Sequence, residues 1–254
     1  MRLARTAVSY VPSPSLLSLR SLRDLGLRRM PHEADFLAFR HLPAGAQVFL
    51  DVGANRGQSI RSIGLVLESV RIVAVEPNPI LAKALQAASN TNVVSVHNVA
   101  LSDQAEGQLT LHVPRYGHTL YDTRAAASPD AARGFLNDNS FVRFSQGRAS
   151  VETYAAPLAT IDGLAVDPTI IKIDVEGADG PVVAGGLATI ERARPILLIE
   201  EPTERSLSLL AALDYTAYRY DGESLVANSL SGLNTFFLRA EHEAAFIAGG
   251  LPLS

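Results

Sequence analysis

The chain has 254 residues, 47% of them hydrophobic, which is enough to bury the core of one α/β domain with an extension. Its formal net charge of -4 gives no general attraction for nucleic acid, so a polynucleotide partner is disfavoured. The absence of cysteine excludes disulfides, thiolate metal sites and a cysteine nucleophile.

The N-terminal region lacks the uninterrupted apolar core of a signal peptide, because Pro12, Pro14 and several serines break residues 8–22. No stretch reaches the roughly 18 apolar residues that a membrane-spanning helix needs. We therefore expect a soluble, cytoplasmic protein with no membrane partner. A homo-oligomer is compatible with the sequence, which does not report oligomeric state.

Residues 15–42 have the pattern of two short amphipathic helices separated at Pro31. We expect residues 1–43 to form a helical arm that serves as a lid or packs on the domain. Residues 44–254 are then expected to form the domain itself.

From residue 46 onward, apolar runs alternate with helical segments. Core strands are predicted at residues 47–52, 71–75, 93–96, 170–175 and 196–200. Helices are predicted to begin near Gly57, Asn78, Gly180 and Thr203. Strands that alternate with helices form a parallel sheet, and two late strands at 215–220 and 235–239 predict an antiparallel edge.

This alternation is interrupted after Val99. Residues 108–113 look like a strand outside the repeat, and the polar stretch that follows is rich in Arg, Asp, Asn and Ser. Long irregular segments inside compact domains are commonly functional. We expect a substrate-binding cap at about residues 114–149.

The first motif, DVGANRG at residues 51–57, lies directly between a predicted strand and a predicted helix. Its glycines, Gly53 and Gly57, let a ligand approach the backbone, and the free amides of the helix start favour polar or anionic groups. Asn55 and Gln58 replace the last two glycines of the dinucleotide fingerprint, so pyrophosphate binding is disfavoured. The alternative is a tight turn in which Asp51 caps local amides.

Two further motifs end the next two strands. In VAVEPNP, residues 73–79, Glu76 follows the glycine turn by about 20 residues, where a carboxylate can accept both ribose hydroxyls of an adenosine cofactor. Glu76 could instead serve only the start of the next helix. NVALSD, residues 98–103, would flank the adenine through Asn98, Ala100 and Ser102, although these residue types also form ordinary turns.

The fourth motif is IIKIDVEGAD at residues 170–179. Period-two alternation predicts that Lys172, Asp174 and Glu176 share one side of the strand. Burying such charges together is unfavourable unless they pair or serve a ligand, so Asp174 is a candidate functional residue and Lys172 could neutralise its neighbours. Asp179, just ahead of Pro181, is expected to be a helix N-cap.

Together with RPILLIEEP at residues 194–202, these motifs resemble the FkbM-type methyltransferase family over about residues 48–201. The resemblance implies a class I methyltransferase fold: a doubly wound, Rossmann-like, mostly parallel seven-stranded sheet with an antiparallel edge strand. It further implies S-adenosylmethionine over Gly53 with its ribose on Glu76, and usually methyl transfer to a hydroxyl oxygen. The residues that carry over are Asp51, Gly53, Asn55, Gly57 and Glu76.

The chain departs from the family pattern at Asp179, where a glutamate is common. Residues 114–149 do not align with the family, so the acceptor cannot be inherited from it. The function predicted is O-methylation of a hydroxyl on a small molecule or sugar. N- or C-methylation remains open, as do an NAD-type nucleotide-binding protein and a non-catalytic cofactor-binding protein.

Methyl transfer is an in-line displacement, in which alignment supplies much of the rate and a general base removes the acceptor's proton. The candidate bases are Asp174, Glu176 and His118, and Asp174 is also a candidate cofactor contact. His118 lies in the expected cap and titrates near neutrality, with an ordinary surface histidine as the alternative. No metal is predicted, because the sequence has no metal-ligand spacing pattern.

Overall fold

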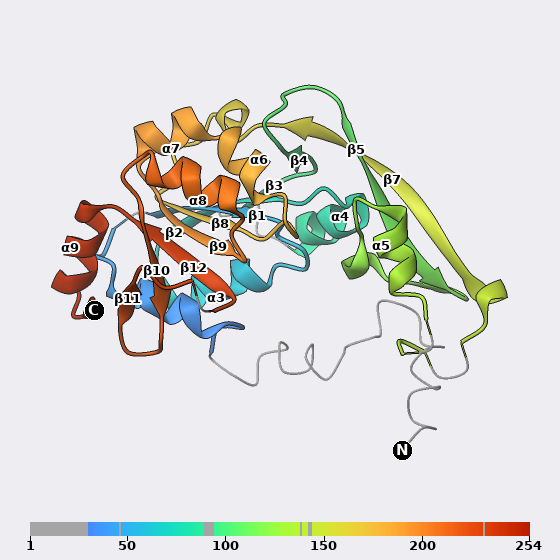
Figure 1. Cartoon of the computed structure of the whole chain (residues 1–254), viewed down its shortest axis with the longest axis horizontal. Coiled ribbons are helices and arrows are strands. Elements are labelled where there is room, and N and C mark those ends of the chain that lie inside the picture. The colour runs from blue at the N-terminus through green and yellow to red at the C-terminus, as the bar shows by residue number, and fades with distance from the viewer. Residues whose placement is uncertain (1–29, 46, 89–93, 138, 142–143, 231) are drawn as a thin grey trace, which may run out of the picture.

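The computed structural model describes residues 30–45, 47–88, 94–137, 139–141, 144–230 and 232–254 (Figure 1). Its main sheet contains the parallel strands β1 (Gln47–Val52), β2 (Val70–Val75), β3 (Val94–His97), β8 (Ile170–Ile173) and β9 (Ile196–Glu200). Beside β9, antiparallel pairing adds β12 (Asn234–Leu238), β10 (Thr216–Tyr220) and β11 (Leu225–Ala227).

The strand order is β11-β10-β12-β9-β8-β1-β2-β3. This order confirms the predicted doubly wound, mostly parallel sheet with an antiparallel edge. The short strand β11 adds an eighth strand to the predicted seven. Burial of the parallel strands on both faces explains why their sequences are nearly continuous runs of Val, Ile and Leu.

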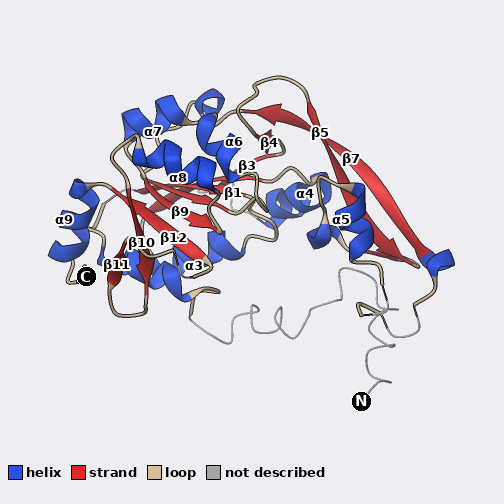
Figure 2. Ribbon diagram, in the orientation of Figure 1, coloured by secondary structure: helices blue, strands red, loops and turns tan. Residues whose placement is uncertain are grey.

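Helices cover both faces of this sheet (Figure 2). One face packs against α6 (Asp179–Ala184), α7 (Leu187–Ala193) and α8 (Glu204–Ala211). The other packs against the 3-10 helix η2 (Ala34–His41), α3 (Gln58–Val66) and α9 (Ala240–Ala248). Near β2 and β3, α4 (Pro79–Ala88) packs through Leu85. None of the helices in the described ranges is long and apolar enough to cross a membrane.

The segment before β1 contributes to the core. Phe36 and Phe39 of η2 are fully buried, with ring contacts to Phe49 of β1 and Phe236 of β12 respectively. The first of the two expected N-terminal helices lies outside the described residues. The expected division of the chain at residue 43 stays a prediction.

A second sheet interrupts the alternation, as a long two-stranded ribbon that extends away from the main sheet (Figure 1). In it, β5 (Gln108–Tyr116) pairs antiparallel with β7 (Ala149–Ala159) over nine residue pairs. Flanking strands are β4 (Ala100–Leu101) and β6 (Thr119–Leu120). The connection between the long strands contains η3 (Asp122–Arg124), α5 (Pro129–Gly134) and η4 (Gln146–Arg148), and η5 (Asp162–Leu164) follows β7.

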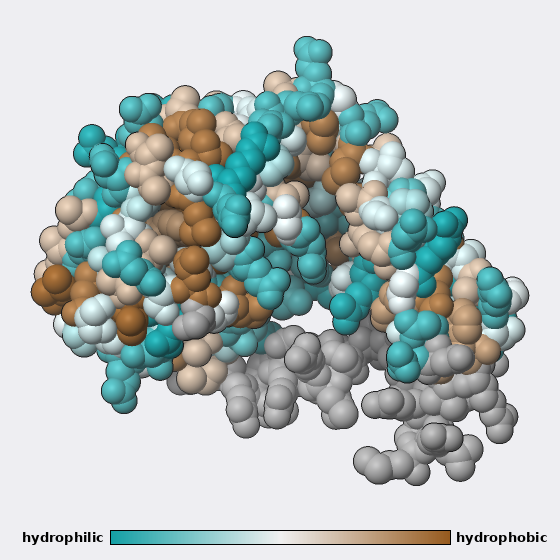
Figure 3. Space-filling model, in the orientation of Figure 1, coloured by the Kyte–Doolittle hydropathy of each residue, from teal (hydrophilic) through white to brown (hydrophobic). Residues whose placement is uncertain are grey.

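Aromatic packing stabilises the free end of the ribbon. Tyr116 stacks on Phe141 with ring centroids 4.2 Å apart, and Phe144 lies on the same ring at 5.6 Å. On the face shown in Figure 3, hydrophilic side chains predominate between the body around the main sheet and the ribbon. This insertion occupies the position of the expected cap, whose role in binding substrate stays a prediction.

Candidate active site

The turn between β1 and α3 lies against the end of β8. Gly53 has a φ of +86°, and a Cβ built there would lie 1.9 Å from the carbonyl oxygen of Asp174. Gly57, the N-cap of α3, has a φ of +80°. The position of Gly53 therefore requires glycine, and the left-handed backbone at Gly57 favours it.

Glu76 follows β2 and is bound to the same turn. Its Oε2 accepts a hydrogen bond from the amide of Asn55 and its Oε1 accepts one from the amide of Asn78, each at 2.8 Å. Burial raises the pKa of Glu76, although both amide hydrogen bonds oppose the shift. The carboxylate is thus held in one orientation, and each oxygen keeps a lone pair that a ligand hydroxyl can use.

Asn98 supports this arrangement from the end of β3. Its Nδ2 donates to the carbonyl oxygens of Glu76, at 2.8 Å, and Pro77, at 3.0 Å. Ala100 is buried in β4, opposite Leu158 of β7, and the amide of Ser102 donates to Ala159. These contacts tie the third motif to the ribbon, and the expected contact with adenine stays a prediction.

Asp51 is a buried carboxyl at the end of β1. It is 1% exposed, and neither carboxylate oxygen has a hydrogen-bond partner in the described part of the chain. Burial raises the pKa of Asp51 to about 7, against the opposing effect of nearby Lys172. The Oδ1 of Asn55 is also buried without a partner. These buried oxygens can therefore accept hydrogen bonds from a polar ligand at this turn.

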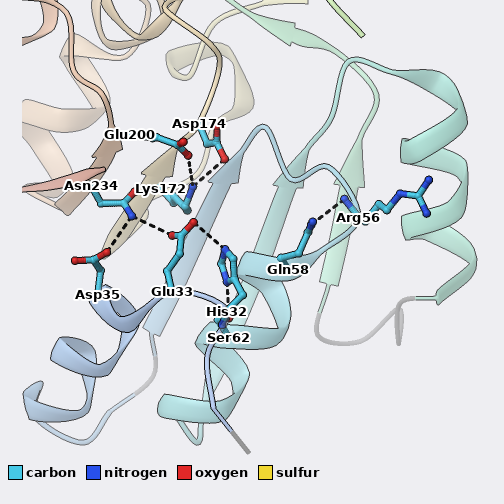
Figure 4. Close-up of polar contacts among 10 residues, drawn as sticks. All are labelled: His32, Glu33, Asp35, Arg56, Gln58, Ser62, Lys172, Asp174, Glu200 and Asn234. Atoms are coloured by element: carbon cyan, nitrogen blue, oxygen red, sulfur yellow. Dashed lines mark hydrogen bonds and ion pairs between the residues drawn. The ribbon is translucent and has the colours of Figure 1, made fainter. Parts of the chain in front are cut away.

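Lys172 is a fully buried cation next to Asp51 in the sheet. Its Nζ lies 3.2 Å from Oδ2 of Asp174 and 4.0 Å from Oε2 of Glu200 (Figure 4). Desolvation alone would lower the pKa of Lys172, but Asp174, Asp51 and Glu33 together raise it. Lys172 therefore stays charged and neutralises part of the surrounding negative charge, which is one of the roles that its position in the sequence suggested.

The segment before η2 completes this cluster from the other side. His32 Nε2 lies 3.2 Å from Oε1 of Glu33. Asn234, at the start of β12, donates through Nδ2 to Glu33 and to Asp35, each at 3.0 Å (Figure 4). No motif in the sequence pointed to Glu200, Glu33 or Asn234 as members of this cluster. Glu200 ends a predicted core strand and could have been found by that position, whereas no local signal links Glu33 to the site.

The other two candidate bases, Glu176 and His118, are exposed. β8 ends at Ile173, and Glu176 is exposed with a φ of +49°, so the predicted alternation holds for Lys172 and Asp174 only. His118 is exposed in the turn between β5 and β6, at the end of the ribbon remote from β4.

The predicted N-cap role of Asp179 is wrong. The side chain of Asp179 makes no cap for its own helix. Its Oδ2 instead accepts hydrogen bonds from the amide and hydroxyl of Thr203 and from the hydroxyl of Ser206, which fixes the start of α8. Asp179 is buried, and α6 packs against α8, which brings these donors within reach of its side chain.

The connection between β5 and β7 contacts the glycine turn, residues 53–57, through Asp122 of η3. Its Oδ1 lies 2.6 Å from Nη2 of Arg56, and its carbonyl oxygen accepts from Nδ2 of Asn78 at 2.9 Å. Among the residues that the structure describes, no group of three or more His, Asp or Glu could hold a metal ion. The polar groups of Asp51, Glu76 and Asp174 lie at the carboxyl ends of β1, β2 and β8. Open α/β sheets bind their ligands at this edge. The fold and the site thus define an α/β protein suited to a nucleoside-type cofactor.

Comparison with known proteins narrows this class. The methyltransferase FkbM domain family matches residues 51–220. The 2-O-methyltransferase NoeI of Sinorhizobium fredii is 28% identical over 178 residues, which cover 66% of this chain and 70% of NoeI. This chain belongs to the FkbM methyltransferase family, a family of S-adenosylmethionine-dependent enzymes, as the resemblance of its motifs predicted.

Two solved methyltransferase structures are similar to this chain at low sequence identity. A methyltransferase FkbM from Methylobacillus flagellatus KT is 16% identical, with a TM-score of 0.46 over 81% of this chain and 50% of that chain. The sugar N-methyltransferase KedS8 from Streptoalloteichus sp. is 12% identical, with a TM-score of 0.42 over 86% of this chain and 90% of that chain. This chain therefore spans half the length of the first of these structures.

Proposed function

We propose that this chain binds S-adenosylmethionine at the turn after β1 and transfers its methyl group to a hydroxyl oxygen of a small molecule or sugar. The observation that carries the proposal is the fixed carboxylate of Glu76, which two amides orient beside the glycine turn. The name of the relative NoeI, a 2-O-methyltransferase, favours an oxygen acceptor.

The buried polar atoms fit such a cofactor. We assign the ribose hydroxyls to Glu76 and the close approach of the ligand to Gly53 and Gly57. Asp51 and Asn55 supply buried oxygens without partners, which can accept hydrogen bonds from the polar groups of the cofactor. The bound cofactor supplies an electrophilic methyl group on a sulfonium ion. The protein's own part is to align the acceptor and to remove its proton.

Calorimetry on the purified chain tests the cofactor assignment. We expect S-adenosylmethionine to bind, NAD not to bind, and Glu76→Ala to weaken binding at least tenfold, because two ribose hydrogen bonds to a charged group are lost. Glu191→Ala, at an exposed position of α7, is the matched control and should bind as the wild type does. Binding of NAD alone, or wild-type affinity in Glu76→Ala, contradicts the assignment.

A second assay tests the acceptor atom. Methyl-labelled cofactor is incubated with the protein and a panel of monosaccharides, polyols, phenols and primary amines, and NMR identifies the atom that carries the label. We expect label on oxygen. Label on nitrogen or carbon would leave the methyltransferase in place and overturn the hydroxyl acceptor.

A further inference from the structure

Two carboxyl groups from neighbouring parallel strands meet over one buried ammonium group. Asp174 follows β8 and Glu200 ends β9, and both point toward Nζ of Lys172 (Figure 4). The side chains of Asp174 and Glu200 are 36% and 27% exposed, whereas that of Lys172 is 1% exposed. Lys172 therefore holds both carboxyl groups from their buried side, and the partly exposed side of each remains accessible to a ligand.

Negative charge exceeds positive charge around this pair. The carboxyl groups of Asp51 and Glu33 also interact electrostatically with Lys172. The positive charges near these carboxyl groups are Lys172 and, when protonated, His32. Like charges held close together favour retention of a proton by one of them. Burial, the charge of Asp174 and a hydrogen bond with Asp174 raise the pKa of Glu200 to about 7.

The two carboxyls differ in how strongly they are paired. Oδ2 of Asp174 lies within hydrogen-bond distance of Nζ of Lys172, at 3.2 Å, whereas Oε2 of Glu200 lies at 4.0 Å. The less strongly paired carboxylate is the better proton acceptor. Glu200 is also held at its backbone, where it pairs with Asn234, the residue that binds Glu33.

We propose that Glu200 is the general base of this methyltransferase and that Lys172 is its positioning residue. The assignment rests on the proposed function. As the acceptor oxygen bonds to the methyl carbon, the carbon–sulfur bond breaks and its electron pair stays on sulfur. The hydroxyl proton passes to the carboxylate of Glu200, whose exposed edge then releases it to solvent.

Proton release on cofactor binding tests this role without an acceptor. Calorimetry at pH 7 in two buffers of different ionisation enthalpy compares S-adenosylmethionine, a sulfonium cation, with neutral S-adenosylhomocysteine. The extra positive charge should expel the proton from Glu200. We expect roughly half a proton more to be released with S-adenosylmethionine than with S-adenosylhomocysteine, since a group with a pKa near the working pH is about half protonated.

Glu200→Gln should abolish this difference and keep the affinity for S-adenosylhomocysteine. Glu201→Gln, at the exposed neighbouring residue, should release protons as the wild type does. Undiminished proton release from Glu200→Gln overturns the assignment of Glu200 and leaves the proposed function standing. Failure of the wild type to bind S-adenosylmethionine overturns both. A thermal melt of each variant confirms that it is folded.

Turnover with the best hydroxyl acceptor of the panel gives a second readout. Glu200→Gln should lower kcat by roughly 10² to 10⁴, the usual contribution of a general base, and Glu200→Asp should restore part of it. Lys172→Met should shift the acidic limb of the pH–kcat profile to higher pH, because the cation that lowers the pKa of Glu200 is removed. A kcat of Glu200→Gln within a factor of three of the wild type contradicts the proposal.

Discussion

At the scale of single residues, the buried carboxyl of Asp51 makes stability depend on pH. Its pKa in the folded chain is about 7 and its ordinary value is 3.8, so folding takes up a proton between these values. The stability that this proton provides is present below pH 4 and is lost as the pH rises toward 7. Asp51→Asn should remove this dependence, since the side chain accepts no hydrogen bond that the substitution would break.

Urea unfolding at pH 5 and pH 8 measures the effect. The free energy of unfolding of Asp51→Asn relative to the wild type should increase by about 1 to 3 kcal/mol between these two values, below the limit of about 1.4 kcal/mol per pH unit. Asp130→Asn, whose side chain is 89% exposed, is the control and should track the wild type. A difference independent of pH would show that Asp51 is ionised throughout.

The local sequence identifies only part of the site. Asp51, Glu76 and Asp174 each lie at the carboxyl end of a predicted strand, and all three lie at one edge of the sheet. Glu33 could not be found in this way, because its place depends on a hydrogen bond to Asn234, 201 residues away in the chain. The predicted alternation does not extend to Glu176, because the strand ends at Ile173.

At the scale of elements, the insertion that contains the β5–β7 ribbon contacts the glycine turn, residues 53–57, through Asp122 of η3. Asp122→Ala removes the ion pair with Arg56, which lies between Asn55 and Gly57 in the turn. We expect the dissociation constant of S-adenosylmethionine to rise about two- to fivefold, the range for a partly exposed ion pair. The backbone contact of Asp122 with Asn78 should survive and limit the loss.

A matched control separates this attachment from a general loss of charge. Asp167→Ala removes a similar pair, with Arg192 at 2.8 Å, ahead of the amino end of β8 and so at the opposite edge of the sheet. Calorimetry should give wild-type affinity for this control. Equal weakening in both variants would argue against a specific role for the ribbon contact.

The elements themselves were largely predictable. The strands expected at 47–52 and 196–200 have those bounds in the structure, and the helices expected near Gly57 and Thr203 begin one residue later. The nine-pair ladder between β5 and β7 was not predicted, because its strands are separated by the whole insertion and register depends on tertiary packing. Strand β11 is three residues long, too short for a periodic signal.

At the scale of the whole molecule, the parallel sheet needs cover on both faces, and η2 provides part of that cover. Phe39 of η2 is fully buried and packs edge-on against Phe236, with ring centroids 5.4 Å apart. The same segment carries Glu33 into the charged cluster around Lys172. We propose that residues 30–43 pack as part of the domain, whereas the expected division of the chain at residue 43 stays a prediction.

Phe39→Ala should lower the free energy of unfolding by about 3 to 5 kcal/mol, the range for truncating a buried phenylalanine, as measured by urea denaturation. Met30→Ala, whose side chain is mostly exposed, should change it by less than about 0.5 kcal/mol. A chain that starts at residue 44 should fail to show a cooperative transition, because removing η2 uncovers Phe49 and Phe236 at once. If that chain instead unfolds as cooperatively as the full protein, residues 30–43 are a dispensable arm, and the contacts of Glu33 and Asn234 are peripheral to the site.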